Sequence, residues 1–249
     1  MKELDDPDRS KELRALIRRK GFLRRYYGEI YDRYRECVNR TPEPGLVVEI
    51  GSGAGFAKDV IPEIVTSDTL PYDGVDRVID ATRMPFADES VRALCMNNVF
   101  HHIPDVEAFL REVYRCLIPG GRVLIVDQHP GWISTPIYRS MYHEPFRMDA
   151  SEWSFESTGP LSGANGALTW IVFQRDRKRF QRLFPELELV RYEPHSPFRY
   201  WLSGGMKPWS LLPSWAFGLA TALDRALVRV APETGSFVDV ELVKRRAKE

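Results

Sequence analysis

The feature that most constrains the fold is a short apolar segment followed by a turn with three glycines. Residues Leu46–Ile50 are apolar except for Glu49, and this length and branching are typical of a buried parallel strand. Glycine then occupies positions 51, 53 and 55, and helix-compatible sequence follows over 55–61. A strand, a glycine turn and a helix place backbone N–H groups where a ligand can approach them. The segment therefore predicts a ligand-binding unit.

The spacing of the glycines narrows the class of ligand. A dinucleotide fingerprint, G-x-G-x-x-G/A, needs a small residue at its sixth position so that helix and strand pack closely. Phe56 stands at that position, which argues against a nucleotide-dependent oxidoreductase. At this point an ordinary glycine-rich turn without a ligand remains an open alternative.

Composition limits the remaining classes. The 249 residues, 43% of them hydrophobic, suit one α/β domain with insertions. A formal net charge of zero predicts no nucleic-acid partner. The cysteines, Cys37, Cys95 and Cys116, lack metal-ligand spacing, so we expect no metal site and a reduced, cytoplasmic location. We expect neither a signal peptide nor a spanning helix, because no long apolar stretch occurs.

Four segments resemble class I S-adenosylmethionine-dependent methyltransferases, in the same order along the chain. They are the acid-x-G-x-G-x-G pattern from Glu49, the D-A-x-x-M-P-F segment from Asp80, His101-His102-Ile103-Pro104, and L-x-P-G-G from Leu117. The resemblance covers residues 46–127. It implies an α/β, Rossmann-like, doubly wound sheet of seven strands with the last strand antiparallel. Insertions after strands five and six would form a cap.

The resemblance also implies S-adenosylmethionine as the cofactor and assigns residues to it. The glycine turn would hold the amino-acid end, Asp68 at the tip of strand two the ribose, and Asp80 with the backbone of Ala81 the adenine. Asn97 ends strand four and faces the same edge. The predicted cofactor-binding residues are Glu49, Gly51, Ser52, Gly53, Gly55, Asp68, Asp80, Ala81 and Asn97.

The segments outside this region are assigned by pattern. Residues 1–40 predict a helical cover, and 41–249 a methyltransferase domain with insertions at about 128–168 and 196–235. Further strands are expected over 64–68, 75–80, 91–97, 122–127, 187–192 and 236–244, with a helix over 106–117. In the second insertion an apolar stripe predicts either a packed lid helix or a helix in a membrane interface; it comprises Trp215, Leu219, Leu223, Leu227 and Val230.

Methyl transfer to a hydroxyl or ring nitrogen needs a proton acceptor. We predict His102, His129 and His143 as catalytic residues, with Glu144 and His195 as further candidates. The expected reaction is O-methylation of a small apolar, sugar or lipid-linked acceptor, with C- or N-methylation open. Peripheral membrane contact and a non-catalytic module that binds S-adenosylmethionine or a nucleoside are the alternatives. The sequence leaves the acceptor and the oligomeric state open.

Overall fold

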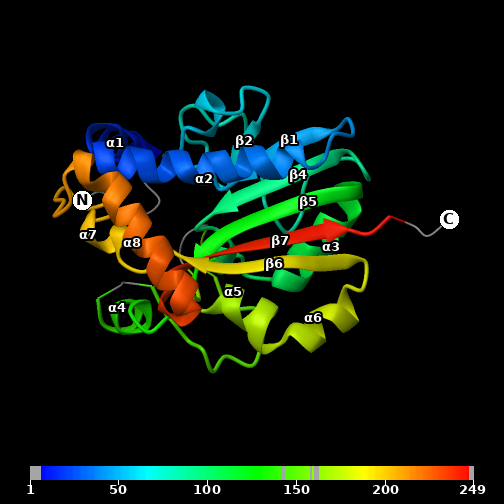
Figure 1. The fold of residues 1–249 in the computed structure, drawn as a ribbon. Coiled ribbons are helices and arrows are strands. Elements are labelled where there is room, and N and C mark those ends of the chain that lie inside the picture. The colour runs from blue at the N-terminus through cyan, green and yellow to red at the C-terminus, as the bar shows by residue number, and fades with distance from the viewer. Residues whose placement is uncertain (1–6, 142–143, 158, 160–162, 247–249) are drawn as a thin grey trace.

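A seven-stranded mixed sheet forms the centre of the molecule (Figure 1). The computed structural model describes residues 7–141, 144–157, 159 and 163–246. The strand order is β3-β2-β1-β4-β5-β7-β6, and within the described residues only β7 runs antiparallel to its neighbours. The predicted α/β sheet with an antiparallel last strand is therefore confirmed. The strands are β1 Leu46–Ile50, β2 Val65–Asp68, β3 Arg77–Val78, β4 Val91–Asn97, β5 Leu117–Gln128, β6 Leu187–His195 and β7 Phe237–Lys244.

Helices cover both faces of this sheet (Figure 1). The α-helices are α1 Pro7–Arg19, α2 Gly21–Asn39, α3 Val106–Cys116, α4 Ser134–Ser140, α5 Leu168–Trp170, α6 Arg177–Leu183, α7 Arg199–Leu202 and α8 Phe217–Val230. Short 3-10 turns lie at Ala57–Asp59, Phe100–His102, Ser214–Ala216 and Pro232–Thr234, and a π-helical turn at Ile171–Arg175. The predicted helix over 106–117 is confirmed, and the Asp105 carboxylate caps it by accepting from Ala108 N–H.

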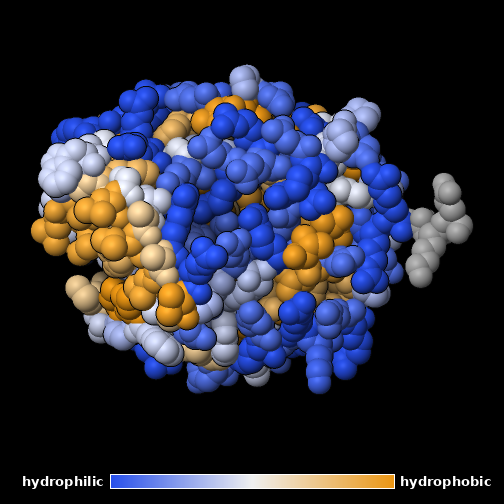
Figure 2. Space-filling model, in the orientation of Figure 1, coloured by the Kyte–Doolittle hydropathy of each residue, from blue (hydrophilic) through white to orange (hydrophobic). Residues whose placement is uncertain are grey.

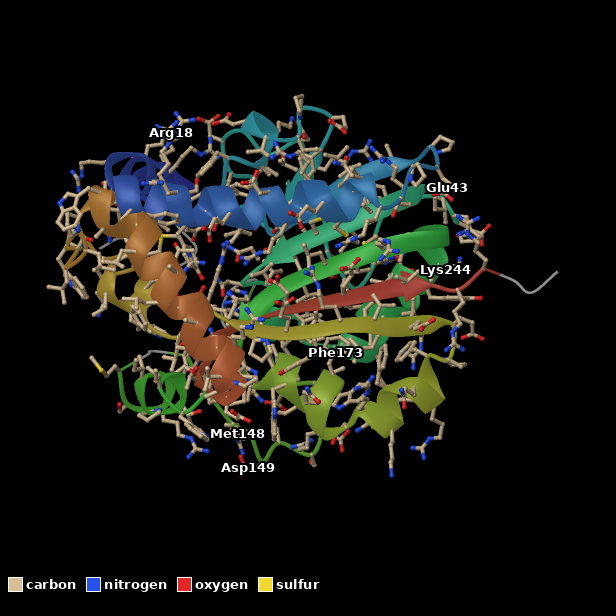
Figure 3. All side chains as sticks on the ribbon, in the orientation of Figure 1. Arg18, Glu43, Met148, Asp149, Phe173 and Lys244 are labelled. Carbon is tan, nitrogen blue, oxygen red and sulfur yellow. The ribbon has the colours of Figure 1, made fainter. Side chains whose placement is uncertain are left out.

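Alternation along the central strands creates two separate cores. Leu94 and Met96 of β4 point to the face covered by α3 and α5, whereas Ala93 and Cys95 point to α2. On the first face the Phe173 ring packs against other aromatic rings of α6 and of the turn after β4 (Figure 3). Because both faces are buried, the strands need the continuous apolar runs seen in the sequence.

The expected helix over 55–61 is wrong, since only the 3-10 turn Ala57–Asp59 forms there. Phe56 N–H donates to the Tyr31 hydroxyl of α2 instead of starting a helix. Pro62 lacks an N–H and closes the segment a few residues later. The third strand is also shorter than the predicted 75–80, because the Asp76 carboxylate accepts from Thr66 N–H and hydroxyl in a turn.

The segments predicted to be insertions, about 128–168 and 196–235, lie at the end of the sheet where the parallel strands finish. Figure 1 shows α4, α7 and α8 at the same end of the sheet as the N-terminal helix α1. Lys20, between α1 and α2, donates to the carbonyls of Gly205 and Lys207 and so joins the N-terminal helices to the second insertion. No helix in the described part of the chain combines the length and apolar content that a membrane crossing requires.

Candidate functional site

A continuous cleft opens beyond the carboxyl ends of β1, β2 and β4. It consists of a cavity of ≈ 530 Å³ and a neighbouring cavity of ≈ 250 Å³. Gly51, Gly53, Asn98 and His102 line both, so the two cavities adjoin. This is the edge of an open α/β sheet at which ligands bind. We call the two parts the larger and the smaller cavity.

The glycine turn forms the floor between the two cavities. Gly51 has φ +70°, and a Cβ there would lie 2.2 Å from Val99 Cγ2. Gly53 has φ +45°, and the nearest atom to a Cβ there would be Asp68 Oδ2 at 3.9 Å. The first glycine is therefore required by close packing. At Gly53 no neighbouring atom of the described residues crowds the backbone, so a ligand can approach it.

Hydrogen bonds to β2 fix this turn in place. Ser52 N–H donates to the carbonyl of Ser67, and Ser67 N–H donates to the Ser52 hydroxyl. Gly53 N–H donates to Asp68 Oδ2 at 2.9 Å. Burial raises the pKa of Asp68, although backbone N–H donors such as that of Gly53 oppose this shift. Asp68 therefore supports the turn as well as facing the larger cavity.

Two buried oxygen atoms near the turn have no partner. Glu49 Oε2 and Asn97 Oδ1 accept no hydrogen bond from the described residues, and both side chains line the smaller cavity. Burial raises the pKa of Glu49 to about 7, helped by Asp68 and opposed by Ser52. A buried acceptor without a donor is costly. The pair therefore fits a ligand that brings a cationic N–H donor to this point.

The far end of the larger cavity carries Asp80 and Ala81. Asp80 Oδ1 accepts from Thr82 N–H and its hydroxyl, at 2.8 and 2.7 Å. Ala81 N–H donates to no group in the described residues. A free carboxylate oxygen beside a free N–H suits a heterocycle edge that offers one donor and one acceptor. Thus the larger cavity has the polar groups that an adenine needs.

A buried ion pair borders the smaller cavity. His101 Nδ1 lies 2.5 Å from Asp127 Oδ1, with side-chain exposures of 2% and 0%. The other Asp127 oxygen accepts from His101 N–H and the Thr169 hydroxyl. Burial alone would lower the pKa of His101, but Asp127 and then Glu144 raise it to about 10. His101 is therefore an imidazolium at neutral pH.

The carboxylate of Glu144 lies between two histidines. Its Oε2 is 3.2 Å from His101 Nε2, and its Oε1 is 3.6 Å from His102 Nε2. His102 Nδ1 donates to the carbonyl of Gly163 at 3.1 Å, which leaves its Nε2 lone pair on the cleft side. Burial, and then the charge on His101, lower the pKa of His102 to about 4. The smaller cavity thus presents an anion, a cation and a neutral imidazole.

The other predicted histidines lie elsewhere or outside the described residues. His129 lines neither cavity; its Nδ1 is 2.9 Å from the Tyr192 hydroxyl of β6, because its side chain faces the sheet edge. His195 contacts Asp239 and the Ser196 hydroxyl. His143 falls outside the residues that the structure describes. Of the predicted bases that the structure describes, His102 and Glu144 line the cleft, whereas His129 and His195 do not.

Sequence reasoning missed His101 and gave Glu144 second rank. A pointer existed, because β4 and β5 are neighbours, Asp127 lies near the end of β5, and His101 follows the end of β4. The sequence also predicts no metal site, yet ligand atoms of His101, His102 and Glu144 lie within 4.8 Å of one another. Within this group His101 Nε2 lies 3.2 Å from Glu144 Oε2, which is an ion-pair distance when the imidazole is protonated.

Comparisons with known proteins agree with this geometry over one part of the chain. The family model described as "Methyltransferase domain" matches residues 48–125. The ubiquinone/menaquinone biosynthesis C-methyltransferase of Desulfotalea psychrophila is 32% identical over 80 residues, 32% of this chain and 32% of that protein. The demethylmenaquinone methyltransferase of Streptomyces avermitilis is 36% identical over 86 residues, 34% of this chain and 32% of that protein.

The chain therefore spans about a third of the length of the curated relatives it matches. Among solved structures, the geranyl diphosphate C-methyltransferase from Streptomyces coelicolor A3(2) aligns at TM-score 0.43 and 16% identity, covering 86% of this chain and 78% of that chain. The matched segment contains the glycine turn, Asp68, Asp80 and Asn97. Residues 48–125 are thus similar in sequence to methyltransferase domains.

Proposed function

We propose that this protein is a methyltransferase that uses S-adenosylmethionine to methylate a small apolar acceptor with an ionisable hydroxyl group. The observation that carries the proposal is the unpartnered pair of Glu49 Oε2 and Asn97 Oδ1. These atoms lie on a cleft whose other end offers Asp80 and the N–H of Ala81. An ammonium group and an adenine on one ligand would satisfy both ends.

The residues present fit this cofactor. Asp80 and Ala81 would hold the adenine, Asp68 the ribose, and Glu49 with Asn97 the ammonium group, while the open backbone at Gly53 admits the chain between them. When bound, S-adenosylmethionine supplies a methyl group on a sulfonium to an aligned nucleophile. In this proposal residues 41–249 make up the methyltransferase domain, and α1 and α2, within residues 1–40, cover the cleft with Tyr27 and Tyr31.

Glu144 is the proposed proton acceptor. Its carboxylate lines the smaller cavity next to the turn, with a side-chain exposure of 16%. The His101 imidazolium, held by Asp127, orients Glu144 and offsets the negative charge that develops when an acceptor hydroxyl loses its proton. His102 Nε2 can accept a hydrogen bond from the same hydroxyl. The predicted catalytic role of His102 therefore stays in the proposal, beside Glu144.

The walls of the smaller cavity support an apolar acceptor. Beyond the polar groups it is lined by aromatic and aliphatic side chains, namely Leu13, Ile17, Tyr27, Tyr31, Tyr200 and Met206. The names of two relatives over the matched region refer to quinone precursors. A reduced quinone or another phenol combines an apolar ring with an ionisable hydroxyl. Loss of its proton activates both the oxygen and the conjugated ring carbon, so O- and C-methylation begin with the same step.

Calorimetry with S-adenosylmethionine, S-adenosylhomocysteine and NAD tests the cofactor assignment. We expect the first two to bind and NAD not to bind, because Phe56 packs against Tyr27 and Tyr31 where a dinucleotide turn needs a small residue. Binding of NAD in the absence of S-adenosylmethionine binding would favour the oxidoreductase alternative instead.

Transfer of tritiated methyl to 1,4-naphthalenediol tests the chemistry. The Glu144→Gln variant is expected to lower kcat by about 100-fold or more while S-adenosylmethionine still binds. Glu156→Gln, at an exposed acid of the same insertion, is the matched control and should retain full turnover. Equal turnover of the two variants contradicts the role of Glu144. Cofactor binding without transfer to this diol or to any metabolite of a cell extract favours the non-catalytic module.

A further inference from the structure

The apolar stripe on α8 and on the 3-10 turn before it faces outward, except for the half-buried Leu227. Trp215, Leu219, Leu223 and Val230 are 81%, 63%, 53% and 86% exposed. The residues of α8 that are buried are Phe217, Ala220, Thr221 and Asp224. This helix therefore buries a mixed side, with Phe217 and Ala220 in the hydrophobic core beside Thr221 and Asp224, and turns its largest aliphatic side chains to solvent.

An ion-pair network fixes this orientation. Arg199, 4% exposed, lies 3.0 Å from Asp224 Oδ2 and 2.6 Å from Glu29 Oε2 of α2. It also donates to the Thr221 hydroxyl at 2.7 Å, and its guanidinium lies 5.0 Å from the centre of the Tyr26 ring. Partners on α2, α7 and α8 thus hold Thr221 and Asp224 of α8 inward, and rotation of the stripe inward would separate them.

The apolar surface continues into the loop before α8. Trp209 and Leu211 are 47% and 69% exposed. Figure 2 shows apolar side chains gathered over this end of the molecule, where Figure 1 places α8, and polar side chains over most of the rest of this view. We call this surface the docking face; its residues are Trp209, Leu211, Trp215, Leu219, Leu223 and Val230. A contiguous exposed patch of this kind marks an interaction site.

The exposed charges of α8 and of the loop before it are of one sign, although Arg225 also lies 3.9 Å from Glu29 Oε1 of α2. Between residues 207 and 230 the cations are Lys207, Arg225 and Arg229, all exposed, and the one acid is Asp224, which is buried. Arg225 and Arg229 lie on the same side of the stripe. Around the helix axis Arg229 is about 80–120° from Leu219 and Leu223, and Arg225 is about 120–160° from them. An apolar helix face with tryptophans and a cationic flank complements the interface of an anionic lipid bilayer.

We propose that the docking face inserts into the interfacial layer of an anionic membrane and that the acceptor reaches the cleft from that layer. The proposal rests on the proposed function only for its second half. Met206 and Tyr200, which line the smaller cavity, are on the same insertion as Trp209. An apolar acceptor dissolved in lipid would thus meet the mouth of the cleft where the protein touches the membrane.

Vesicle flotation without cofactor or acceptor tests the docking. The protein is expected to float with vesicles of equal phosphatidylcholine and phosphatidylglycerol, and less with phosphatidylcholine alone. The double variant Leu219→Gln/Leu223→Gln should weaken vesicle binding about tenfold or more, because each leucine buries its side chain in the bilayer interface. Leu183→Gln on α6, also at an exposed leucine (41%) but far from α8, is the matched control and should float like the wild type (Figure 1).

A charge variant tests whether the docking face binds anionic lipid rather than another protein. Arg225→Gln/Arg229→Gln should weaken binding to the anionic vesicles about tenfold or more and leave binding to phosphatidylcholine unchanged. Lys178→Gln/Arg182→Gln, two exposed cations of α6, serves as the control. High salt should reproduce the effect of the α8 variant.

Failure to float with either vesicle overturns the docking proposal and leaves the proposed function untouched. The docking proposal is also overturned if light scattering shows that the wild type is a dimer and that Leu219→Gln/Leu223→Gln is a monomer. A second copy of the chain would then cover the docking face. A different outcome is that this protein floats with the vesicles but does not bind S-adenosylmethionine. It sustains the docking and contradicts the proposed function.

Discussion

At the scale of single residues, Glu49 should make cofactor binding depend on pH. Its pKa is raised to about 7, chiefly by burial, and a bound ammonium group would favour the carboxylate form. Affinity for S-adenosylmethionine is therefore expected to be full above about pH 7 and to fall about tenfold per pH unit below it. Calorimetry across this range measures the slope.

Glu49→Gln should remove this slope and weaken binding about tenfold or more above pH 7. The matched control is Glu186→Gln, at an exposed acid of the loop before β6, which should keep the wild-type profile. A wild-type affinity that does not change between about pH 8 and about pH 6 would mean that the ammonium group binds elsewhere.

The pair of His101 and Asp127 should stabilise the fold in a defined pH window. Burial opposes the charge on His101, but Asp127 raises its pKa from 6.5 to about 10. Because the folded pKa is raised, this contribution to the free energy of unfolding is fully present below about pH 6.5 and is lost as pH rises through about 10. Urea unfolding of the wild type should therefore lose stability over this range relative to Asp127→Asn. Parallel curves for the two proteins would contradict the ion pair.

The sequence predicts individual site residues on the cofactor side of the cleft better than on the acceptor side. The cofactor residues follow strand ends in order, so the chain itself places Glu49, Asp68 and Asp80 at one edge. The acceptor side depends on contacts between distant segments. Which of two adjacent histidines meets Asp127 is decided by a single 3-10 turn, and Glu144 arrives from an insertion without a repeating pattern.

At the scale of elements, α8 depends on its buried cation. Arg199→Met would leave Asp224, 2% exposed, without its partner, and should lower the free energy of unfolding by about 3–5 kcal/mol. Arg199→Met/Asp224→Leu should recover much of this loss, because no lone charge remains buried. Arg35→Met, which breaks the exposed pair with Asp32, should cost less than about 1 kcal/mol. Equal urea midpoints for the two single variants would contradict this account.

The elements themselves were predictable where periodicity is strong and uninterrupted. The strands β1 and β4 and the helix α3 begin and end close to their predicted limits, because apolar runs and a capping Asp105 define them. The segment after the glycine turn was not predictable in this way. There Phe56 N–H donates a hydrogen bond to the Tyr31 hydroxyl of α2, and no α-helix forms. Periodicity also finds the stripe on α8 but not its direction, which a buried arginine from another helix decides.

At the scale of the whole molecule, the cleft joins parts of the chain that are distant in sequence. The glycine turn, the end of β4, the first insertion and the second insertion all contribute lining residues, for example Gly53, Asn97, Glu144 and Met206. A ligand that contacts all of these segments in the folded state alone must stabilise the entire fold by mass action. Thermal unfolding therefore reports on the site without any knowledge of the acceptor.

At a free concentration about 100 times its Kd, S-adenosylmethionine should add about 2.7 kcal/mol to the free energy of unfolding. For a chain of this size that corresponds to a rise in Tm of about 5–10 °C, measurable by calorimetry or by fluorescence. NAD at the same concentration should leave Tm unchanged. The Asp80→Asn variant tests the position of the adenine, because it alters the proposed adenine acceptor on an exposed side chain. It should reduce the rise in Tm without lowering the Tm of the free protein. A full rise in this variant would place the adenine away from Asp80, and a rise with NAD alone would contradict the cofactor assignment.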